Sequence, residues 1–286
     1  MNQHVLSFAE LDKSSLSFAG GKGGMLARMF QDGYPIPEGF VILPSAFHAE
    51  KLQLEAWNKI QVYLNAIRKK YQEARFAVRS SALNEDSAQA SFAGEYETVL
   101  NVKTDEGVWE AIYTVYRSKH SVRVKAYSVV QGMEETKQIA IVVQLMLQSE
   151  LSGVLFTADP VTGSHANMIG NYVFGLGEKL VSGEVNAHSF TFVRPQGKYH
   201  GPDEFAKYAP KLFTFAERLE KQLDCPQDIE WSVAKGKLYI LQARPITTLR
   251  AGNLDTYEIN ESLTGDFLWV NTNIGEAIPD VMTPLT

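Results

Sequence analysis

The sequence predicts an α+β fold, because segments with helical periodicity and segments with strand periodicity both recur along the chain. Apolar residues recur at helical spacing in residues 45–73, 105–131 and 203–223. Continuous apolar runs of strand length occupy residues 139–147 and 151–157. Residues 228–246 alternate polar and apolar side chains on both sides of a Lys-Gly-Lys break, which predicts a β-hairpin.

The composition is that of a globular protein and argues against several functional classes. The 286 residues are 45% hydrophobic and 21% charged, which fits one large domain or two smaller ones. A net charge of -6 argues against a broadly basic nucleic-acid surface. Cys225 is the single cysteine, so no intrachain disulfide can form. The chain opens without a signal-peptide pattern and has no apolar run of roughly 18 residues. We therefore expect a cytoplasmic protein.

The first notable motif is Gly-Gly-Lys-Gly-Gly at residues 20–24, followed by a short helix that we expect to end near Gly33. Glycine allows backbone N–H groups to approach an anion, and a helix N-terminus adds partial positive charge. Lys22 would add a full charge. Gly23 follows the lysine where a Walker A loop requires Ser or Thr, so this is not a Walker A loop. The motif predicts a phosphate-binding loop, and the alternative is a flexible hinge.

Two further segments add polar side chains to predicted strands. Arg79 ends an apolar strand beside small hydroxyl residues, where a phosphate clamp is often found; the alternative is an exposed arginine that caps a sheet edge. Residues 91–94 are mostly small and predict a second loop over phosphates, or else an ordinary turn. Gln144 interrupts the apolar run 139–147, either as an edge-facing side chain or as a group that reads a base edge.

The remaining elements lead to the hairpin. We expect strands at residues 167–174 and 189–193, then the helix at 203–223. His165 and His188 lack His or Cys partners at metal-ligand spacing. After Arg250 the pattern weakens, so residues 251–286 read as a linker or as the start of another unit.

In the hairpin, the loop length decides which side chains meet. Asp228 and Glu230 share one face of the first arm, and Gln242 and Arg244 share one face of the second. A three-residue loop with Gly in the left-handed conformation puts Glu230 beside Gln242 and Arg244, whereas a two-residue loop separates them. We predict the three-residue loop, because Lys-Gly is a weaker two-residue turn signal than Asn-Gly. Carboxylate and amide oxygens suit Mg²⁺, and a guanidinium suits phosphate. The alternative is an amphipathic hairpin with one solvated face.

Taken in order, these motifs resemble the nucleotide-binding domain of the pyruvate phosphate dikinase superfamily. The matching blocks lie at residues 20–24, 77–82, 90–98, 153–160, 175–178 and 228–245. The resemblance implies an ATP-grasp-type fold of two subdomains with the nucleotide site between them. It assigns residues 1–143 to the first subdomain and 144–248 to the second, and leaves 249–286 as a linker or the start of a following domain.

The resemblance also implies a role for each matched residue, with ATP and Mg²⁺ as the cofactors. Lys22 and Arg79 would hold ATP phosphates, and Arg244 would contact the transferring phosphates; these three are the expected catalytic residues. Gly94 and Thr98 would belong to the loop that covers the phosphates. Gln144 would lie at the adenine-side hinge, and Glu230 and Gln242 would coordinate Mg²⁺.

The implied activity is that of a dikinase-type phosphotransferase, of which this chain would be the ATP-binding part. ATP would be cleaved to AMP, and one phosphate would pass through a histidine on a separate swivelling domain to an acceptor. Residues 267–284 most resemble rifampin phosphotransferase-like proteins. Phosphoenolpyruvate synthase, with pyruvate as acceptor, is the alternative enzyme, and a nucleotide-binding module without phosphate transfer is the alternative of another class. The expected partners are ATP, the His-bearing domain and an acceptor-binding domain, with no nucleic acid and no membrane.

Two departures from the superfamily pattern qualify these expectations. The spacing from Lys22 to Arg79 is shorter than in long family members, which predicts a trimmed first subdomain. The Gly-Gly-x-Thr-Ser-His block of the swivelling domain is not found, and His165, although it follows Gly-Ser, is not assigned that role. We therefore expect this chain to bind ATP and not to complete a transfer cycle alone.

Overall fold

The computed structural model describes residues 4–82, 97–119, 138–177 and 187–246, together with the backbone of residues 259–262 and 265–268. Two compact units divide the chain. The first comprises Met1–Gln148 with Tyr239–Gln242, and the second comprises Ser149–Leu238 with Ala243–Thr286. Gly94, the predicted loop at 91–94 and the second half of the predicted helix at 105–131 lie outside the described residues.

Within the described residues, one antiparallel sheet in the order β1-β2-β7-β5-β6 forms the centre of the first unit. Its strands are β1 (Val5–Ser7), β2 (Gly39–Ile42), β5 (Arg75–Ala82), β6 (Thr98–Val102) and β7 (Ile139–Met146). The central strand β7 is apolar along almost its whole length because both of its faces are covered. A short hairpin, β3 (Phe47–His48) with β4 (Lys51–Leu52), lies outside this sheet.

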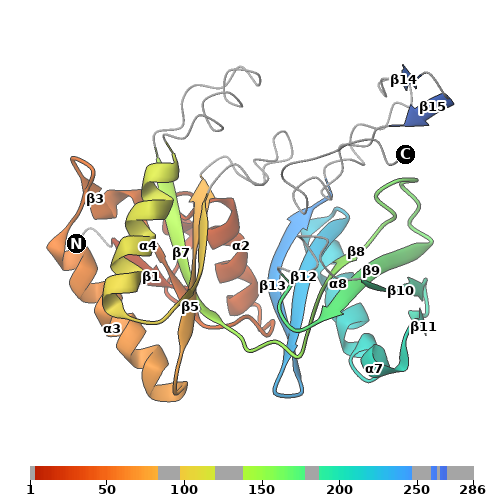
Figure 1. The fold of residues 1–286 in the computed structure, drawn as a ribbon, viewed down its shortest axis with the longest axis horizontal. Coiled ribbons are helices and arrows are strands. Elements are labelled where there is room, and N and C mark those ends of the chain that lie inside the picture. The colour runs from red at the N-terminus through yellow and green to blue at the C-terminus, as the bar shows by residue number, and fades with distance from the viewer. Residues whose placement is uncertain are drawn as a thin grey trace. The chain divides into compact units, whose positions relative to one another are not determined.

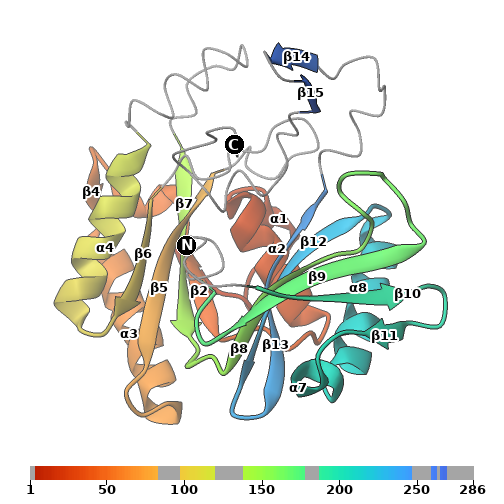
Figure 2. The same cartoon turned by 45° about the vertical axis from the view of Figure 1, so that its right-hand side comes forward.

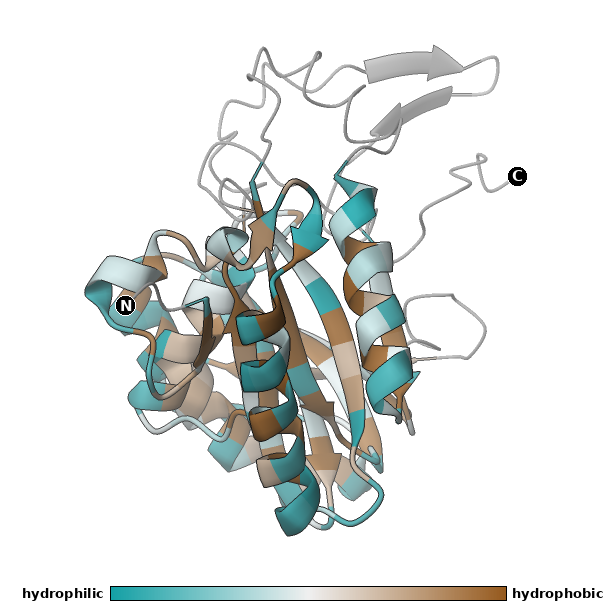
Figure 3. Ribbon diagram, turned by 90° about the vertical axis from the view of Figure 1, so that its left-hand side faces the viewer, coloured by the Kyte–Doolittle hydropathy of each residue, from teal (hydrophilic) through white to brown (hydrophobic). Residues whose placement is uncertain are grey.

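Helices cover both faces of the first sheet (Figure 1). One face packs against α3 (Leu54–Lys70) and α4 (Asp105–Ser118), and α2 (Gly20–Gln31) covers the opposite face. The short helix α1 (Lys13–Leu16) precedes α2. Both α3 and α4 combine hydrophilic and hydrophobic residues along their length, as amphipathic helices do (Figure 3). The core under them includes Phe40, Ile60, Phe76, Ile112 and Ile141, each at most 1% exposed.

A second antiparallel sheet, in the order β11-β10-β9-β8-β12-β13, belongs to the second unit except for residues 239–242 of its edge strand β13. Its strands are β8 (Leu151–Phe156), β9 (Asn167–Phe174), β10 (His188–Val193), β11 (Lys198–His200), β12 (Gln227–Ala234) and β13 (Lys237–Pro245). Helices α7 (Asp203–Ala206) and α8 (Ala209–Leu223) lie along one face of this sheet (Figure 2). A separate two-stranded hairpin joins β14 (Ile259–Ser262) and β15 (Gly265–Leu268).

Aromatic rings fill the space between the second sheet and its helices. The Trp231 ring stacks on Phe205 at a centroid distance of 4.5 Å, and Phe190 lies 4.9 Å from Phe205. Gly153 and Gly170 leave room for these rings, because a Cβ at Gly170 would lie 2.2 Å from Phe190 Cζ. This packing commits one face of the sheet to the core and leaves the other face for the polar side chains Asp228 and Glu230.

The α+β class is as predicted, and most predicted strands agree with the structure to within a residue or two. The predicted helix at 45–73 is wrong in its first third. Pro44–Ala46 forms a single 3₁₀ turn, and Ala49 and Glu50 adopt φ values of 47° and 63°, so a tight turn precedes the helix, which begins at Leu54. In the described part of the chain, no helix has the length and apolar character needed to cross a membrane.

Candidate functional site

The Gly-Gly-Lys-Gly-Gly motif is helical, which corrects the prediction of a loop. Helix α2 begins at Gly20, so Lys22 lies half-buried in its first turn. A Cβ at Gly20 would lie 2.2 Å from the backbone oxygen of Ser81, and φ at this residue is +71°. A Cβ at Gly23 would lie 3.1 Å from Val41. These glycines therefore bring the start of the helix into direct contact with the sheet, which neither a flexible hinge nor an open loop would do.

The first sheet brings three of the predicted residues onto one face. Arg79 on β5 pairs directly with Thr98 on β6 and with Val142 on β7. Gln144 pairs with Ala77, two residues before Arg79. Directly paired residues share a face, and so do residues two apart on a strand. Arg79, Thr98 and Gln144 therefore lie on the same face.

Helix α2 covers this same face. A Cβ at Gly23 would lie 3.4 Å from Val142, the direct neighbour of Arg79. The first turn of α2, which carries Lys22, is also bonded to Ser81, two residues beyond Arg79 on β5. The fold thus brings the helix turn that carries Lys22 onto the sheet face that carries Arg79.

The guanidinium of Arg79 fits an anionic ligand. Its Nε atom is buried and has no hydrogen-bond partner among the described residues. A buried donor without a partner is costly, by about 1–3 kcal/mol, unless something accepts its hydrogen bond. A phosphate oxygen would be such an acceptor, and a guanidinium is well suited to phosphate.

Gln144 and Thr98 differ in their surroundings. Gln144 is 3% exposed, and its Nε2 donates to the backbone oxygen of Pro37 at 3.3 Å. This contact rules out an exposed, edge-facing side chain. Thr98 is exposed at the start of β6.

The hairpin turn between β12 and β13 has two residues, so the predicted three-residue loop is wrong. Only Lys235 and Gly236 separate the strands, with φ values of 49° and 67°. Positive φ at both positions is the pattern of a type I′ turn, whose twist matches that of the strands. Lys235 adopts the left-handed conformation, which glycine adopts at lower cost than other residues.

Despite the shorter turn, Arg244 lies on the face of Asp228 and Glu230. Regular pairing from a two-residue turn would place Asp228 opposite Ala243 and Arg244 on the other face. Instead, Arg244 Nε donates to Asp228 Oδ2 at 2.9 Å, and Ile246 N donates to Pro226 O at 2.9 Å. Both contacts are one residue out of step with the turn. From these two contacts we infer a one-residue β-bulge in β13, between the turn and Arg244.

Burial makes the Asp228–Arg244 pair unusual. The two side chains are 4% and 10% exposed, and the pairing was not predicted from the sequence. The signal was present, because Asp228 is two residues before Glu230 and hence on the same face. Glu230 itself is only partly buried and lies opposite Val154 on β8.

The oxygen atoms of Glu230 and Gln242 are of the kind that Mg²⁺ prefers, and they would be only a few of its ligands. Glu230 offers a carboxylate, and Gln242, on the neighbouring strand, offers an amide oxygen. Across the described residues, no cluster of three His, Cys, Asp or Glu side chains could hold a metal ion. Mg²⁺ commonly takes only one or two protein carboxylates and completes its shell with water and substrate phosphates.

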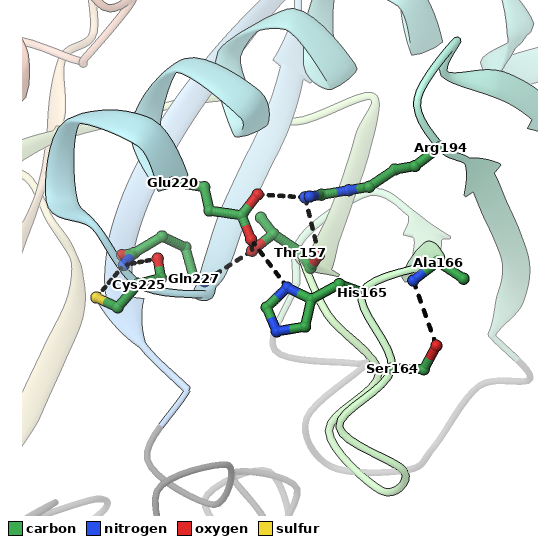
Figure 4. A network of polar contacts seen from close by, with 8 residues as sticks. All are labelled: Thr157, Ser164, His165, Ala166, Arg194, Glu220, Cys225 and Gln227. Atoms are coloured by element: carbon green, nitrogen blue, oxygen red, sulfur yellow. Dashed lines mark hydrogen bonds and ion pairs between the residues drawn. The ribbon is translucent and has the colours of Figure 1, made fainter.

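His165 belongs to a polar network that holds the loop between β8 and β9 (Figure 4). Its Nδ1 lies 3.8 Å from Glu220 Oε1 on α8, and Thr157 Oγ1 donates to the same oxygen at 3.2 Å. Arg194 pairs with Glu220 and donates to Thr157 O at 3.0 Å. A surface groove of about 700 Å³ runs past His165 and Cys225. Glu220 thus ties the ends of two strands and a loop to one helix.

Comparison with known proteins identifies the family. The family described as "Pyruvate phosphate dikinase, AMP/ATP-binding domain" matches residues 43–204 and 203–262. The chain belongs to this family. The match confirms the resemblance stated above, and the structure confirms the α+β class.

Two relatives show the range of proteins in which such a domain occurs. The chain is 32% identical to a probable phosphoenolpyruvate synthase of Archaeoglobus fulgidus, over 92% of this chain and 44% of the relative. It is 30% identical to a rifampicin phosphotransferase of Bacillus cereus, over 100% of this chain and 40% of the relative. The chain thus spans less than half the length of these curated relatives.

Among solved structures, the chain is similar to D-alanyl-alanine synthetase A from Vibrio cholerae. The TM-score is 0.41 and the identity 12%, over 78% of this chain and 58% of that structure.

Proposed function

We propose that this chain is the ATP-binding part of a dikinase-type phosphotransferase that converts ATP to AMP. Membership of the family supports ATP as the ligand. One structural observation supports the place of its phosphates: Arg79, whose buried Nε lacks a partner among the described residues, shares a sheet face with the first turn of α2. In this proposal Lys22 and Arg79 hold the outer phosphates of ATP. Thr98 and Gly94 belong to the segment that covers them, and Gln144 faces the adenine side.

The cationic side chains would do most of the chemical work. Phosphoryl transfer depends mainly on positioning and on neutralising the charge of the phosphate oxygens. Lys22, Arg79 and Arg244 supply three positive charges for this purpose. Asp228 holds Arg244 in one orientation, so that the guanidinium meets the phosphates without having to be ordered by them.

Glu230 and Gln242 would hold Mg²⁺. We propose that the inferred bulge in β13 lies before Gln242. The Gln242 side chain would then lie opposite Glu230, on the same face as Arg244, which is two residues further along the strand. A bound Mg²⁺ would neutralise phosphate charge and orient the phosphates. The carboxylate of Glu230 contributes the charge and Gln242 a neutral oxygen, a pair that suits a hard cation.

The acceptor of the whole protein would be rifampin-like. The support is the extent of similarity, because the match to the rifampicin phosphotransferase covers the whole chain, whereas that to the probable phosphoenolpyruvate synthase covers 92%. Pyruvate remains the alternative acceptor, since the two identities are 30% and 32%. Phosphate would reach the acceptor through a histidine on another domain. Incubating the full-length protein with ATP and either rifampicin or pyruvate, and following AMP and the phosphorylated product by ³¹P NMR, decides between them.

Lys22→Ala should weaken ATP binding by about tenfold or more, and AMP binding much less, because AMP lacks the outer phosphates and a charged hydrogen bond contributes about 1.5–3 kcal/mol. Calorimetric titration of both nucleotides measures the two affinities. Lys13→Ala, on the exposed helix α1, is the matched control and should change neither. Equal losses for ATP and AMP would move Lys22 away from the outer phosphates.

A further inference from the structure

Ser81 bridges two groups that belong to the first turn of α2. Its Oγ accepts a hydrogen bond from Gly23 N at 2.9 Å and donates one to Ala19 O at 2.7 Å. In a regular helix, the N–H of residue 23 would bond directly to the carbonyl of residue 19. The hydroxyl of a residue 58 positions away in the sequence therefore connects the donor and acceptor that close this turn.

The surroundings allow this bridge little freedom. Ser81 is fully buried, and both of its hydrogen bonds are buried. Gly20 takes φ +71° and has no space for a side chain, since a Cβ would lie 2.4 Å from Ser81 Oγ. The α2 N-cap residue, Ala19, makes no side-chain capping hydrogen bond, so Ser81 supplies from the sheet a polar contact that a helix usually obtains from its own cap.

We propose that Ser81 is a positioning residue for Lys22. It fixes the turn that carries Lys22 to the end of β5, the strand that carries Arg79, and so sets the distance between the two cations. The inference rests on the proposed function, because it gives Lys22 a phosphate to hold. Without the hydroxyl, Gly23 N and Ala19 O lose a shared partner, the first turn relaxes, and Lys22 no longer meets the outer phosphates in a fixed place.

The test is a double-mutant cycle on nucleotide affinity. The parent, Ser81→Ala, Lys22→Ala and the double variant are titrated with ATP and with AMP by calorimetry. Ser81→Ala should weaken the binding of ATP about tenfold, because two buried hydrogen bonds are lost, and should weaken the binding of AMP much less. In the Lys22→Ala background the same change should add little, because the residue that Ser81 positions is gone. Ser80→Ala, on the opposite face of β5, is the control and should keep the ATP-to-AMP preference.

Thermal unfolding of every variant separates misfolding from mispositioning. If Ser81→Ala does not fold, Ser81→Cys replaces it, since a thiol keeps the shape of the side chain but is a weak donor and acceptor. A folded Ser81 variant with the parent's preference for ATP over AMP would overturn the inference. So would a loss that is equally large in the Lys22→Ala background. Should Lys22→Ala bind ATP as the parent does, the proposed function fails, and this inference fails with it.

Discussion

Replacing Glu230 by alanine should abolish the strengthening of ATP binding by Mg²⁺ and leave the fold intact. The side chain is only partly buried and lies on the polar face of its sheet, opposite Val154, so little packing is lost. The lost carboxylate is the charged protein ligand of the proposed metal site. Mutating a residue that only hydrogen-bonds to a metal ligand already lowers metal affinity by about 10–100-fold. The loss of a ligand itself should lower it by at least as much. Calorimetric titration with ATP, with and without Mg²⁺, measures the effect.

Two companion variants sharpen this result. Glu230→Gln keeps an oxygen ligand without the charge and should retain part of the Mg²⁺ effect. Glu204→Ala removes an exposed carboxylate from α7 in the same unit and should leave the Mg²⁺ effect unchanged. If Glu230→Ala binds ATP with the parent's full dependence on Mg²⁺, then Glu230 is not a metal ligand, and the polar face of the hairpin serves another purpose.

The strands were more predictable than the helix starts, for a physical reason. An apolar run such as Ile139–Met146 has to be buried whatever surrounds it, so its pattern survives into the structure. The start of a helix depends on a few local conformations instead. Ala49 and Glu50 adopt positive φ, which their residue types do not announce, and this turn moved the helix start to Leu54.

The candidate site shows a similar division. The residue types suggested the kind of ligand, because an arginine beside small hydroxyl residues suits a phosphate, and the structure adds that the Nε of Arg79 is buried without a hydrogen-bond partner among the described residues. The contacts that position these residues could not be predicted from the sequence. Ser81 reaches Gly23 across 58 positions of sequence, and Arg244 contacts Asp228 one residue out of step with the two-residue turn. Such long-range contacts and register shifts are set by tertiary packing, which periodicity does not encode.

The buried pair of Asp228 and Arg244 should be the most sensitive point of the second unit's stability. Asp228→Ala should lower the free energy of unfolding by about 3–5 kcal/mol, because it leaves a buried guanidinium without its carboxylate. The two side chains are 4% and 10% exposed, and Nε and Oδ2 are 2.9 Å apart, so solvent cannot replace the lost partner cheaply. Urea unfolding followed by tryptophan fluorescence measures the change, since Trp231 lies on the same strand.

Two comparisons test whether the cost comes from breaking this buried ion pair. Glu38→Ala removes the partner of Lys70, whose side chain is 63% exposed, and should cost at most about 1 kcal/mol. Asp228→Ala combined with Arg244→Met should be more stable than Asp228→Ala alone, because the buried charge is gone as well. If Asp228→Ala costs no more than Glu38→Ala, the pair is not what holds Arg244 in place, and the orientation of this guanidinium must come from its other contacts.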